Sequence, residues 1–340
     1  MGQPDSGLIN VALRLGSFSV RDVTIPLEKG RINGIGGKNG SGKSTLLRAI
    51  YGYLRLDRGA ILIDGREIGE YSERERASKI SVVHQEHPEP ISFRVRDIVS
   101  LYGTWSGSSL SLESVAARTG IAHLMDRDFS TLSGGEKRLV MIAAALYQDT
   151  EFVLMDEPTA FLDVDRELLV YDLIRQASLM GKTVVVVLHD VNSLAALCHR
   201  ITFMKEGQVV AHGRPEEVLR TDILERVYDT GFTVRDGIFV PVRRDLSGLR
   251  VRVTGRDTWR IEEILAMHGA QMGGGQMELH YDGSVVRVSL NGASREMPCT
   301  RPEDAAEAAR LVFHGTMEEY RVSTSSMISR SERPEDFAMK

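Results

Sequence analysis

The sequence has few cysteines and no long apolar segment, and both absences limit what the protein can be. Among its 340 residues only Cys198 and Cys299 carry a thiol, which is too few for a disulfide framework and favours a reducing compartment. No run approaches the ~20 apolar residues that a membrane-spanning helix needs. The first residues lack the basic segment and long apolar stretch expected of a signal peptide. We therefore expect any role at a membrane to depend on a partner.

The sequence also lacks an excess of positive charge. Lys and Arg number 42 against 47 Asp and Glu, which gives a formal net charge of −5. Nucleic acids and anionic lipids bind through basic surfaces, so we expect no nucleic acid as a partner. With 42% hydrophobic and 26% charged residues, the composition is that of an ordinary globular protein. The length is sufficient for two or three domains.

The spacing of apolar residues predicts an α/β fold. Alternating apolar and polar residues at about 8–30 are typical of two antiparallel strands. Continuous apolar runs at 152–155 and 184–188, separated by a helical pattern at about 165–180, are typical of strands buried on both faces. Strands that alternate with helices in this way indicate a mostly parallel sheet covered by helices.

The pattern changes near Pro241, where we expect a second, smaller domain. A strand and a helix are followed by a hairpin around Asp282, and a last helix begins with Thr300 and Glu303 at capping-box spacing. This βαββα order predicts a small α+β domain, and the polar, Ser-rich end of the chain is predicted to be disordered. The expected boundaries are 8–242 for the first domain, about 86–135 for a helical subdomain within it, 245–322 for the second domain and 323–340 for the tail.

A glycine-rich run, GGKNGSGKST at residues 36–45, is the most informative stretch. It fits the pattern G-x-x-x-x-G-K-[ST] and lies between a predicted strand and a predicted helix. Glycines let backbone N–H groups surround an anion, and the helix N-terminus adds its positive dipole end. Lys43 then places a charge on the β- and γ-phosphates, and the Ser44 hydroxyl can ligate Mg²⁺. The run predicts a nucleoside triphosphate site but does not separate a GTPase, a kinase and a transport ATPase. Its candidate residues are Gly37, Asn39, Gly40, Gly42, Lys43, Ser44 and Thr45.

Two adjacent acids follow the buried strand at 152–155. Asp156 at the strand end can deliver a carboxylate to the Mg²⁺ shell. Glu157 beside it can orient or deprotonate a water molecule. This pairing of a phosphate loop with two acids at a strand end predicts hydrolysis of the nucleotide.

A second anion-binding feature, LSGGE, occupies residues 132–136. Ser133, Gly134 and Gly135 at the start of a helix make a second N-terminus that suits phosphate. Because it lies far along the chain from the glycine-rich run, both need not serve one nucleotide within one subunit. A head-to-tail dimer, in which LSGGE of each subunit covers the partner's nucleotide, accounts for both.

The ordered set of motifs resembles the ATP-binding subunits of ABC transporters over about residues 8–242. The resemblance implies a P-loop NTPase core with a mixed sheet and a helical subdomain. The motifs are GKNGSGKST (Walker A), Gln85 in VVHQE (Q-loop), LSGGE (signature), FVLMDEP (Walker B), AFLD at 160–163 (D-loop) and His189 in VVLHD (switch His).

The resemblance also implies a role for each motif residue. Gln85 contacts Mg²⁺ or the attacking water, and His189 contacts the γ-phosphate. Asp156 binds Mg²⁺ through water, Glu157 polarises the attacking water, and Asp163 acts across the dimer interface. The implied catalytic set is Glu157, His189 and Gln85; the metal set is Ser44, Gln85 and Asp156; and Ser133, Gly134 and Gly135 contact the partner's γ-phosphate.

Residues 188–228 are similar to the importers of iron–siderophore complexes, haem and cobalamin. This implies an ATP- and Mg²⁺-dependent homodimer that drives a polytopic membrane permease, fed by a solute-binding protein. The protein would be cytoplasmic, held peripherally on the inner face of the membrane through the permease. An alternative is a soluble ABC-type ATPase that acts in protein or cofactor assembly without transport. The second domain could be a small-molecule sensor, a dimerisation module or a clamp on the permease.

Four departures from the family pattern are visible. Lys38 stands where proline is usual, and Ala144 where arginine is frequent. The aromatic residue that stacks on adenine is not evident, with Phe18 the nearest candidate. The segment from Gln85 to Leu132, 47 residues long (132 − 85), is shorter than expected for the permease-docking region, which keeps the assembly alternative open.

Overall fold

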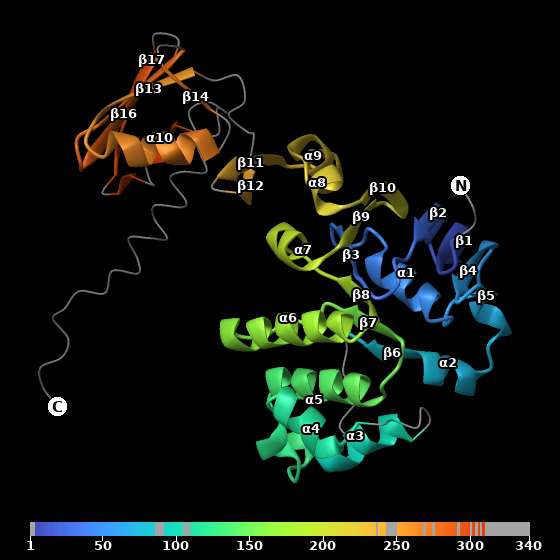
Figure 1. Cartoon of the computed structure of the whole chain (residues 1–340). Coiled ribbons are helices and arrows are strands. Elements are labelled where there is room, and N and C mark those ends of the chain that lie inside the picture. Colours follow the sequence, from blue (N-terminus) through green and yellow to red (C-terminus); the bar gives the residue numbers. More distant parts are fainter. Residues whose placement is uncertain are drawn as a thin grey trace, which may run out of the picture. The chain divides into compact units, whose positions relative to one another are not determined.

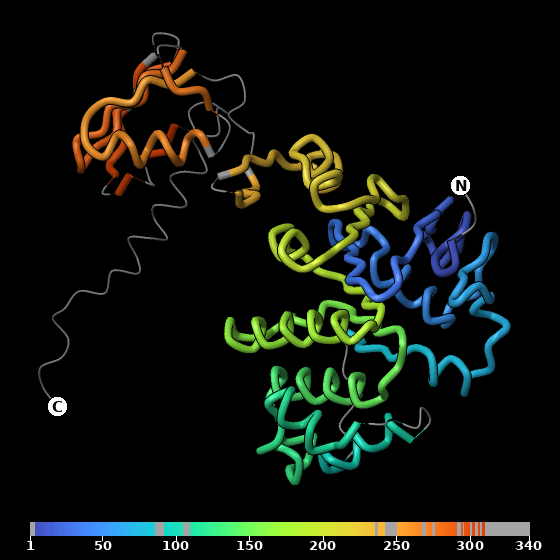
Figure 2. Tube along the Cα trace, in the orientation of Figure 1, coloured from blue at the N-terminus to red at the C-terminus, as the bar shows by residue number. Residues whose placement is uncertain are grey.

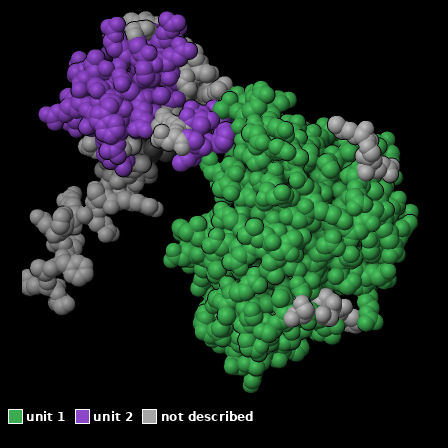
Figure 3. Space-filling model, in the orientation of Figure 1, with its two compact units in different colours: residues 1–229 green, residues 230–340 purple. Residues whose placement is uncertain are grey.

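The chain forms two compact units, Met1–Asp229 and Thr230–Lys340 (Figure 3), each described here by itself. The division falls before the hairpin at 231–242, which the predicted boundary placed in the first domain; those domain boundaries stay a prediction. The predicted tail at 323–340 lies outside the described residues. The computed structural model describes residues 4–85, 92–104, 108, 110–235, 237–242, 250–267, 270–273, 276–290, 293–299, 301–302, 305–306 and 308–309.

A six-stranded sheet forms the centre of the first unit, in the order β10-β9-β3-β8-β7-β6 (Figure 1). All of its neighbouring pairs are parallel except β9 with β10, so the carboxyl ends of β3, β7 and β8 meet at one edge. That edge carries the glycine-rich loop and the two acids, because each follows directly from a buried strand. The strands are β3 Ile32–Gly37, β6 Ile80–Val83, β7 Phe152–Asp156, β8 Thr183–Val187, β9 Arg200–Lys205 and β10 Gln208–Gly213.

An antiparallel sheet, β2-β1-β4-β5, forms a second layer, and helix α1 packs between the two sheets. Leu46 and Ile50 of α1 are buried in one cluster with residues of both sheets, among them Leu8 and Val185. Burying apolar side chains on both sides of α1 fixes its first turn against the carboxyl end of β3. The elements are β1 Gly7–Leu15, β2 Phe18–Pro26, α1 Lys43–Ile50, β4 Arg58–Ile63 and β5 Arg66–Glu67.

Helices cover the rest of this unit, and α3, α4 and α5 form a layer at one end of it, as the tube in Figure 2 also shows. Within the described part of the chain, no helix combines the length and apolar character needed to cross a membrane. The mixed sheets with their helices confirm the predicted α/β class. The helices are α2 Glu73–Lys79, α3 Val95–Gly103, α4 Leu112–Arg118, α5 Gly134–Tyr147, α6 Val164–Leu179, α7 Val191–Leu197, α8 Pro215–Val218 and α9 Thr221–Tyr228, with short 3₁₀ turns at Ile68–Glu70, Ala122–Leu124 and Phe129–Thr131.

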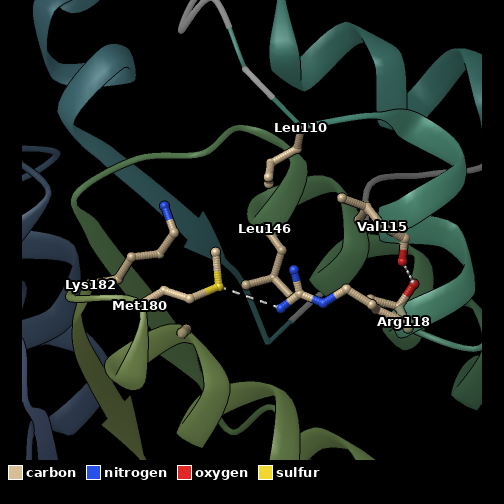
Figure 4. A pocket seen from close by; sticks show the side chains of 8 residues that line it. Leu110, Val115, Arg118, Leu146, Met180 and Lys182 are labelled. Carbon is tan, nitrogen blue, oxygen red and sulfur yellow. Dashed lines mark hydrogen bonds between the residues drawn. The ribbon is translucent and has the colours of Figure 1, made fainter.

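Arg118 of α4 contacts α6 and the residue that follows it (Figure 4). Its guanidinium donates to Gln176 Oε1 at 3.2 Å and lies 3.7 Å from Met180 Sδ, beside a hollow of about 10 Å³. A space of this size holds about one water molecule, so it is a packing gap and no ligand site.

Asp64 joins three segments of the first unit. Its carboxylate pairs with Lys29 and lies 2.8 Å from Lys79 Nζ, which is also 2.9 Å from Glu151 Oε2. Burial by itself raises the pKa of Asp64, but the hydrogen bonds from Lys29 and Lys79 outweigh it and hold the pKa below the usual value.

This cluster predicts a pH-dependent contribution to stability. Because the folded-state pKa of Asp64 is depressed, its contribution is present above the unfolded-state pKa and is lost as pH falls through the folded-state value. Asp64→Asn should cost about 1–2 kcal/mol at pH 7 and less at pH 3, as measured by urea unfolding at both pH values. An equal cost at the two pH values would contradict the assignment.

The second unit contains a hairpin and a five-stranded sheet in the order β14-β13-β15-β16-β17. Strand β13 is parallel to β14 and β15, while β15, β16 and β17 pair antiparallel. Strand β17 is an addition to the expected βαββα order; ASREMP has little strand propensity, and pairing with β16 forms it. Thr300 and Glu303, the predicted cap of the last helix, lie outside the described residues. The elements are β11 Gly231–Arg235, β12 Ile238–Val242, β13 Arg250–Gly255, α10 Thr258–Met267, β14 Gln271–Met272, β15 Met277–Tyr281, β16 Val285–Leu290 and β17 Ala293–Pro298.

Candidate nucleotide-binding and hydrolytic site

The glycine-rich loop turns from β3 into α1 as its pattern predicts. Gly42 at the N-cap has φ 104°, and a Cβ at Gly37 would lie 2.3 Å from the Met204 carbonyl oxygen, so both positions require glycine. Lys43 Nζ donates to the carbonyls of Gly37 and Lys38 at 2.9 Å each. Burial lowers the pKa of Lys43 despite the nearby Glu157 and Asp156 carboxylates. Its ammonium is thus folded back onto the loop, where phosphate oxygens could replace the two carbonyls.

The two acids at the end of β7 face this loop. Ser44 Oγ donates to Asp156 Oδ1 at 3.0 Å, which brings together two of the predicted metal ligands. Burial raises the pKa of Asp156, and the hydrogen bond from Ser44 opposes that shift. A hydroxyl and a carboxylate oxygen side by side are the kind of donor that Mg²⁺ takes in proteins.

Glu157 is held by the other two predicted catalytic residues. Gln85 Nε2 donates to Glu157 Oε2 at 2.8 Å, and His189 Nε2 lies 2.5 Å from Glu157 Oε1. The Glu157 backbone adopts φ 50°, a left-handed conformation that few non-glycine residues take and that clusters at functional sites. The three side chains, which come from different strand ends, line one cleft of about 470 Å³ together with the glycine-rich loop.

Leu15 and Phe18 line the same cleft, at the turn from β1 to β2. A Cβ on Gly42 would lie 2.9 Å from Phe18 Cζ, so this ring packs directly against the start of α1. Phe18 also contacts the apolar cluster of the first unit. It therefore combines a core contact with a surface in the cleft, where a nucleotide base would need an apolar face.

The remaining predicted residues lie apart from this cleft. Ser133 caps α5, its Oγ accepting from the Glu136 N–H at 3.3 Å, and Asp163 caps α6, accepting from the Arg166 N–H at 3.0 Å. Neither they nor Gly134 and Gly135 line the cleft, and Ser133, Gly134 and Asp163 are exposed. Within one subunit, Ser133 and Asp163 are helix caps. The exposed surfaces of these two residues and of Gly134 are therefore open to a second molecule.

Arg138 of α5 is a functional candidate that the sequence analysis missed. Its side chain is 2% exposed, and it donates to the Pro158 carbonyl at 3.2 Å, to the Gln85 carbonyl at 3.4 Å and to the carbonyls of His84, Asp156 and Glu157. One guanidinium therefore joins the signature helix to the segments that carry Gln85 and Glu157. Its sequence signal is an arginine at the start of the apolar stretch LVMIAAAL, directly after Glu136 and Lys137.

Comparisons with known proteins agree with this geometry. The ABC transporter family model matches residues 20–160. The petrobactin import ATP-binding protein YclP of Bacillus subtilis is 31% identical over 223 residues, which cover 63% of this chain and 88% of YclP. The hemin import ATP-binding protein HmuV of Rhodococcus jostii is 36% identical over 214 residues, covering 61% of this chain and 73% of HmuV.

Solved structures lead to the same family. A bacterial ABC transporter cassette determined as a dimer superimposes with a TM-score of 0.56 at 26% identity, covering 62% of this chain and 98% of the cassette. CbiO1 of Clostridium perfringens, part of an ABC transporter complex, gives a TM-score of 0.56 at 26% identity, covering 66% of this chain and 94% of CbiO1. The chain belongs to the ABC transporter ATP-binding proteins. It is an ATP-hydrolysing subunit of this family, as the resemblance implied.

Proposed function

We propose that this ATPase drives uptake of an iron complex, haem or cobalamin. The geometry that carries the hydrolytic part is the Glu157 carboxylate, held between Gln85 and His189 on the cleft that Lys43 and Ser44 also line. The choice of solute is supported by the relatives, whose names include petrobactin, hemin and cobalamin import.

Each residue of the cleft then has a chemical role. The loop Gly37–Thr45 and Lys43 bind the phosphates, and Leu15 with Phe18 covers the base. Ser44, Asp156 and Gln85 would hold Mg²⁺, which neutralises charge on the phosphates when bound. Glu157 accepts a proton from water or orients it, and His189 beside it approaches the γ-phosphate.

The dimer is proposed to be head-to-tail. Ser133, Gly134 and Gly135 at the start of α5 would contact the γ-phosphate of the nucleotide bound by the other subunit, and Asp163 would lie at the interface. Ser133, Gly134 and Asp163 are exposed and do not line the subunit's own cleft, which supports this arrangement, because a helix N-terminus binds phosphate well only when it is open to it. ATP would then favour the closed dimer, and hydrolysis would release it.

A second hollow of the first unit suits the permease. Its volume is about 880 Å³, and Tyr51, Tyr53, Arg74 and Arg76 are among its lining residues. The Tyr53 ring is 58% exposed and lies 5.8 Å from the His84 ring, next to Gln85 in the chain. Aromatic residues and arginine are enriched in protein–protein interfaces, and this hollow presents both. A permease bound here would lie near His84, which precedes Gln85 in the chain. A solute-binding protein would act on the permease from its other side.

Capture of the permease tests the transport proposal. We expect tagged Glu157→Gln protein, expressed in its native cell with ATP, to retain a polytopic membrane protein that mass spectrometry identifies. Tyr53→Asp in the same background should lose this partner while still dimerising. The matched control Leu179→Asp, at the exposed end of α6, should keep it. Recovery of soluble partners alone would overturn the transport proposal. It would favour a soluble ATPase that acts in protein or cofactor assembly in the cytoplasm.

A further inference from the structure

The end of the first unit contacts the phosphate loop through a cluster of charges that the roles above do not use. Lys38 Nζ lies 3.0 Å from Asp229 Oδ2, and Lys205 Nζ lies 2.5 Å from Asp229 Oδ1. The Lys205 ammonium also donates to the Arg226 carbonyl at 3.0 Å, one of the last carbonyls of α9. Asp229 therefore joins the loop to β9 and to the end of α9.

The backbone of Lys38 is part of the nucleotide site itself. Its carbonyl accepts from Lys43 Nζ at 2.9 Å and from the Ser41 N–H at 3.1 Å. The position of this carbonyl thus fixes both the turn of the loop and the resting place of the Lys43 ammonium.

Asp229 occupies a special place in the chain. It ends α9 in a left-handed conformation, φ 50°, and is the last residue of the first unit; strand β11 begins at Gly231. Hydrogen bonds from Lys205 and Lys38 lower the pKa of its carboxyl, so the group is ionised at neutral pH. Asp229 therefore holds Lys38 from the residue at which the first unit ends.

We propose that Asp229 is a positioning residue for the phosphate loop: through Lys38 it fixes the carbonyl against which Lys43 rests, at the point where the chain enters the second unit. The inference rests on the proposed assignment of Lys43 to the phosphates. Lys38 stands where the family pattern has proline, which could not make this ion pair, so the contact is a property of this chain. The two side chains are 46% and 52% exposed, and an ion pair so exposed changes affinity by a modest factor.

A double-mutant cycle in the full chain tests the proposal. At low salt, Lys38→Ala should weaken ATP binding about two- to fivefold in the wild-type background and leave it unchanged in the Asp229→Asn background. The loss should appear mainly as a rise in KM for ATP rather than as a fall in kcat. Isothermal titration gives the affinities and phosphate release gives kcat and KM. A simple loss of positive charge near the phosphates would instead weaken binding equally in both backgrounds, which would overturn the proposal.

Two further variants distinguish failure of this proposal from failure of the phosphate site on which it rests. Asp172→Asn removes a comparably exposed ion pair, 3.1 Å to Arg175 on α6, and should leave ATP affinity unchanged. Lys43→Ala should lose ATP binding. If Lys43→Ala binds ATP normally, the proposed phosphate site fails and this proposal with it. If Lys43→Ala loses binding but Lys38→Ala has no effect, only the role of Asp229 and Lys38 is overturned.

Discussion

Replacing Glu157 by glutamine should reduce ATP hydrolysis by about 10²–10⁴-fold while leaving ATP binding intact. An amide cannot accept a proton from the attacking water, and loss of a general base costs a factor of this order. It can, however, still take part in hydrogen bonds with Gln85 and His189, so the cleft should keep its shape. Lys43 and Ser44 remain to bind the nucleotide. Because hydrolysis is what reopens the proposed dimer, the variant should accumulate as an ATP-bound dimer.

Phosphate release under saturating ATP measures the first effect, and size-exclusion chromatography with light scattering measures the second. Glu113→Gln is the matched control, because Glu113 is exposed on α4 and away from the cleft. It should hydrolyse ATP at the wild-type rate and dissociate normally. Glu157→Gln protein that turns over within about threefold of wild type would remove Glu157 from the catalytic set and leave His189 as the principal candidate.

The local parts of the site could be predicted because each depends on a short stretch of chain. Gly37 and Gly42 predict the loop, since only glycine tolerates the positive φ and the close approach of other atoms found there. The apolar run 152–155 predicts a buried strand and places Asp156 and Glu157 at its end.

What sequence reasoning could not supply depends on distant segments. The contact of Lys38 with Asp229 spans 191 residues, and no local pattern encodes it. Strand β17 forms by pairing with β16 against its own weak propensity. The family pattern predicts one aromatic side chain against the base. In the structure, Leu15 and Phe18 line the cleft together. Motif roles that belong to the dimer, such as those of Ser133 and Asp163, stay predictions because one subunit presents only helix caps there.

Arg138 also depends on contacts between distant segments of the chain. Its replacement should strongly reduce both stability and ATP turnover. Arg138→Met keeps an unbranched side chain in the buried site but leaves the buried carbonyls of Asp156 and Glu157 without their donor. A buried polar group that loses its partner costs about 1–3 kcal/mol, so the variant should unfold at a lower urea concentration. Glu157 should also move from its left-handed position, and a displacement of about 1 Å at a catalytic group can cost 10²-fold in rate. Ala144, where the family often has arginine, is fully buried on the same helix and offers no donor in exchange.

The loss of turnover should therefore exceed the loss of folded protein, which separates positioning from a purely structural role. Turnover per folded molecule, with the folded fraction taken from circular dichroism, should fall at least about tenfold in Arg138→Met and less in Arg138→Lys, which can reach some of the carbonyls. Lys137→Met is the control on the same helix, since Lys137 is only half-buried and lies 5.7 Å from the Phe129 ring. If Arg138→Met is less stable but each folded molecule hydrolyses ATP at the wild-type rate, Arg138 supports the fold alone. Helix α5, which carries the signature motif, would then not position Glu157 through this side chain.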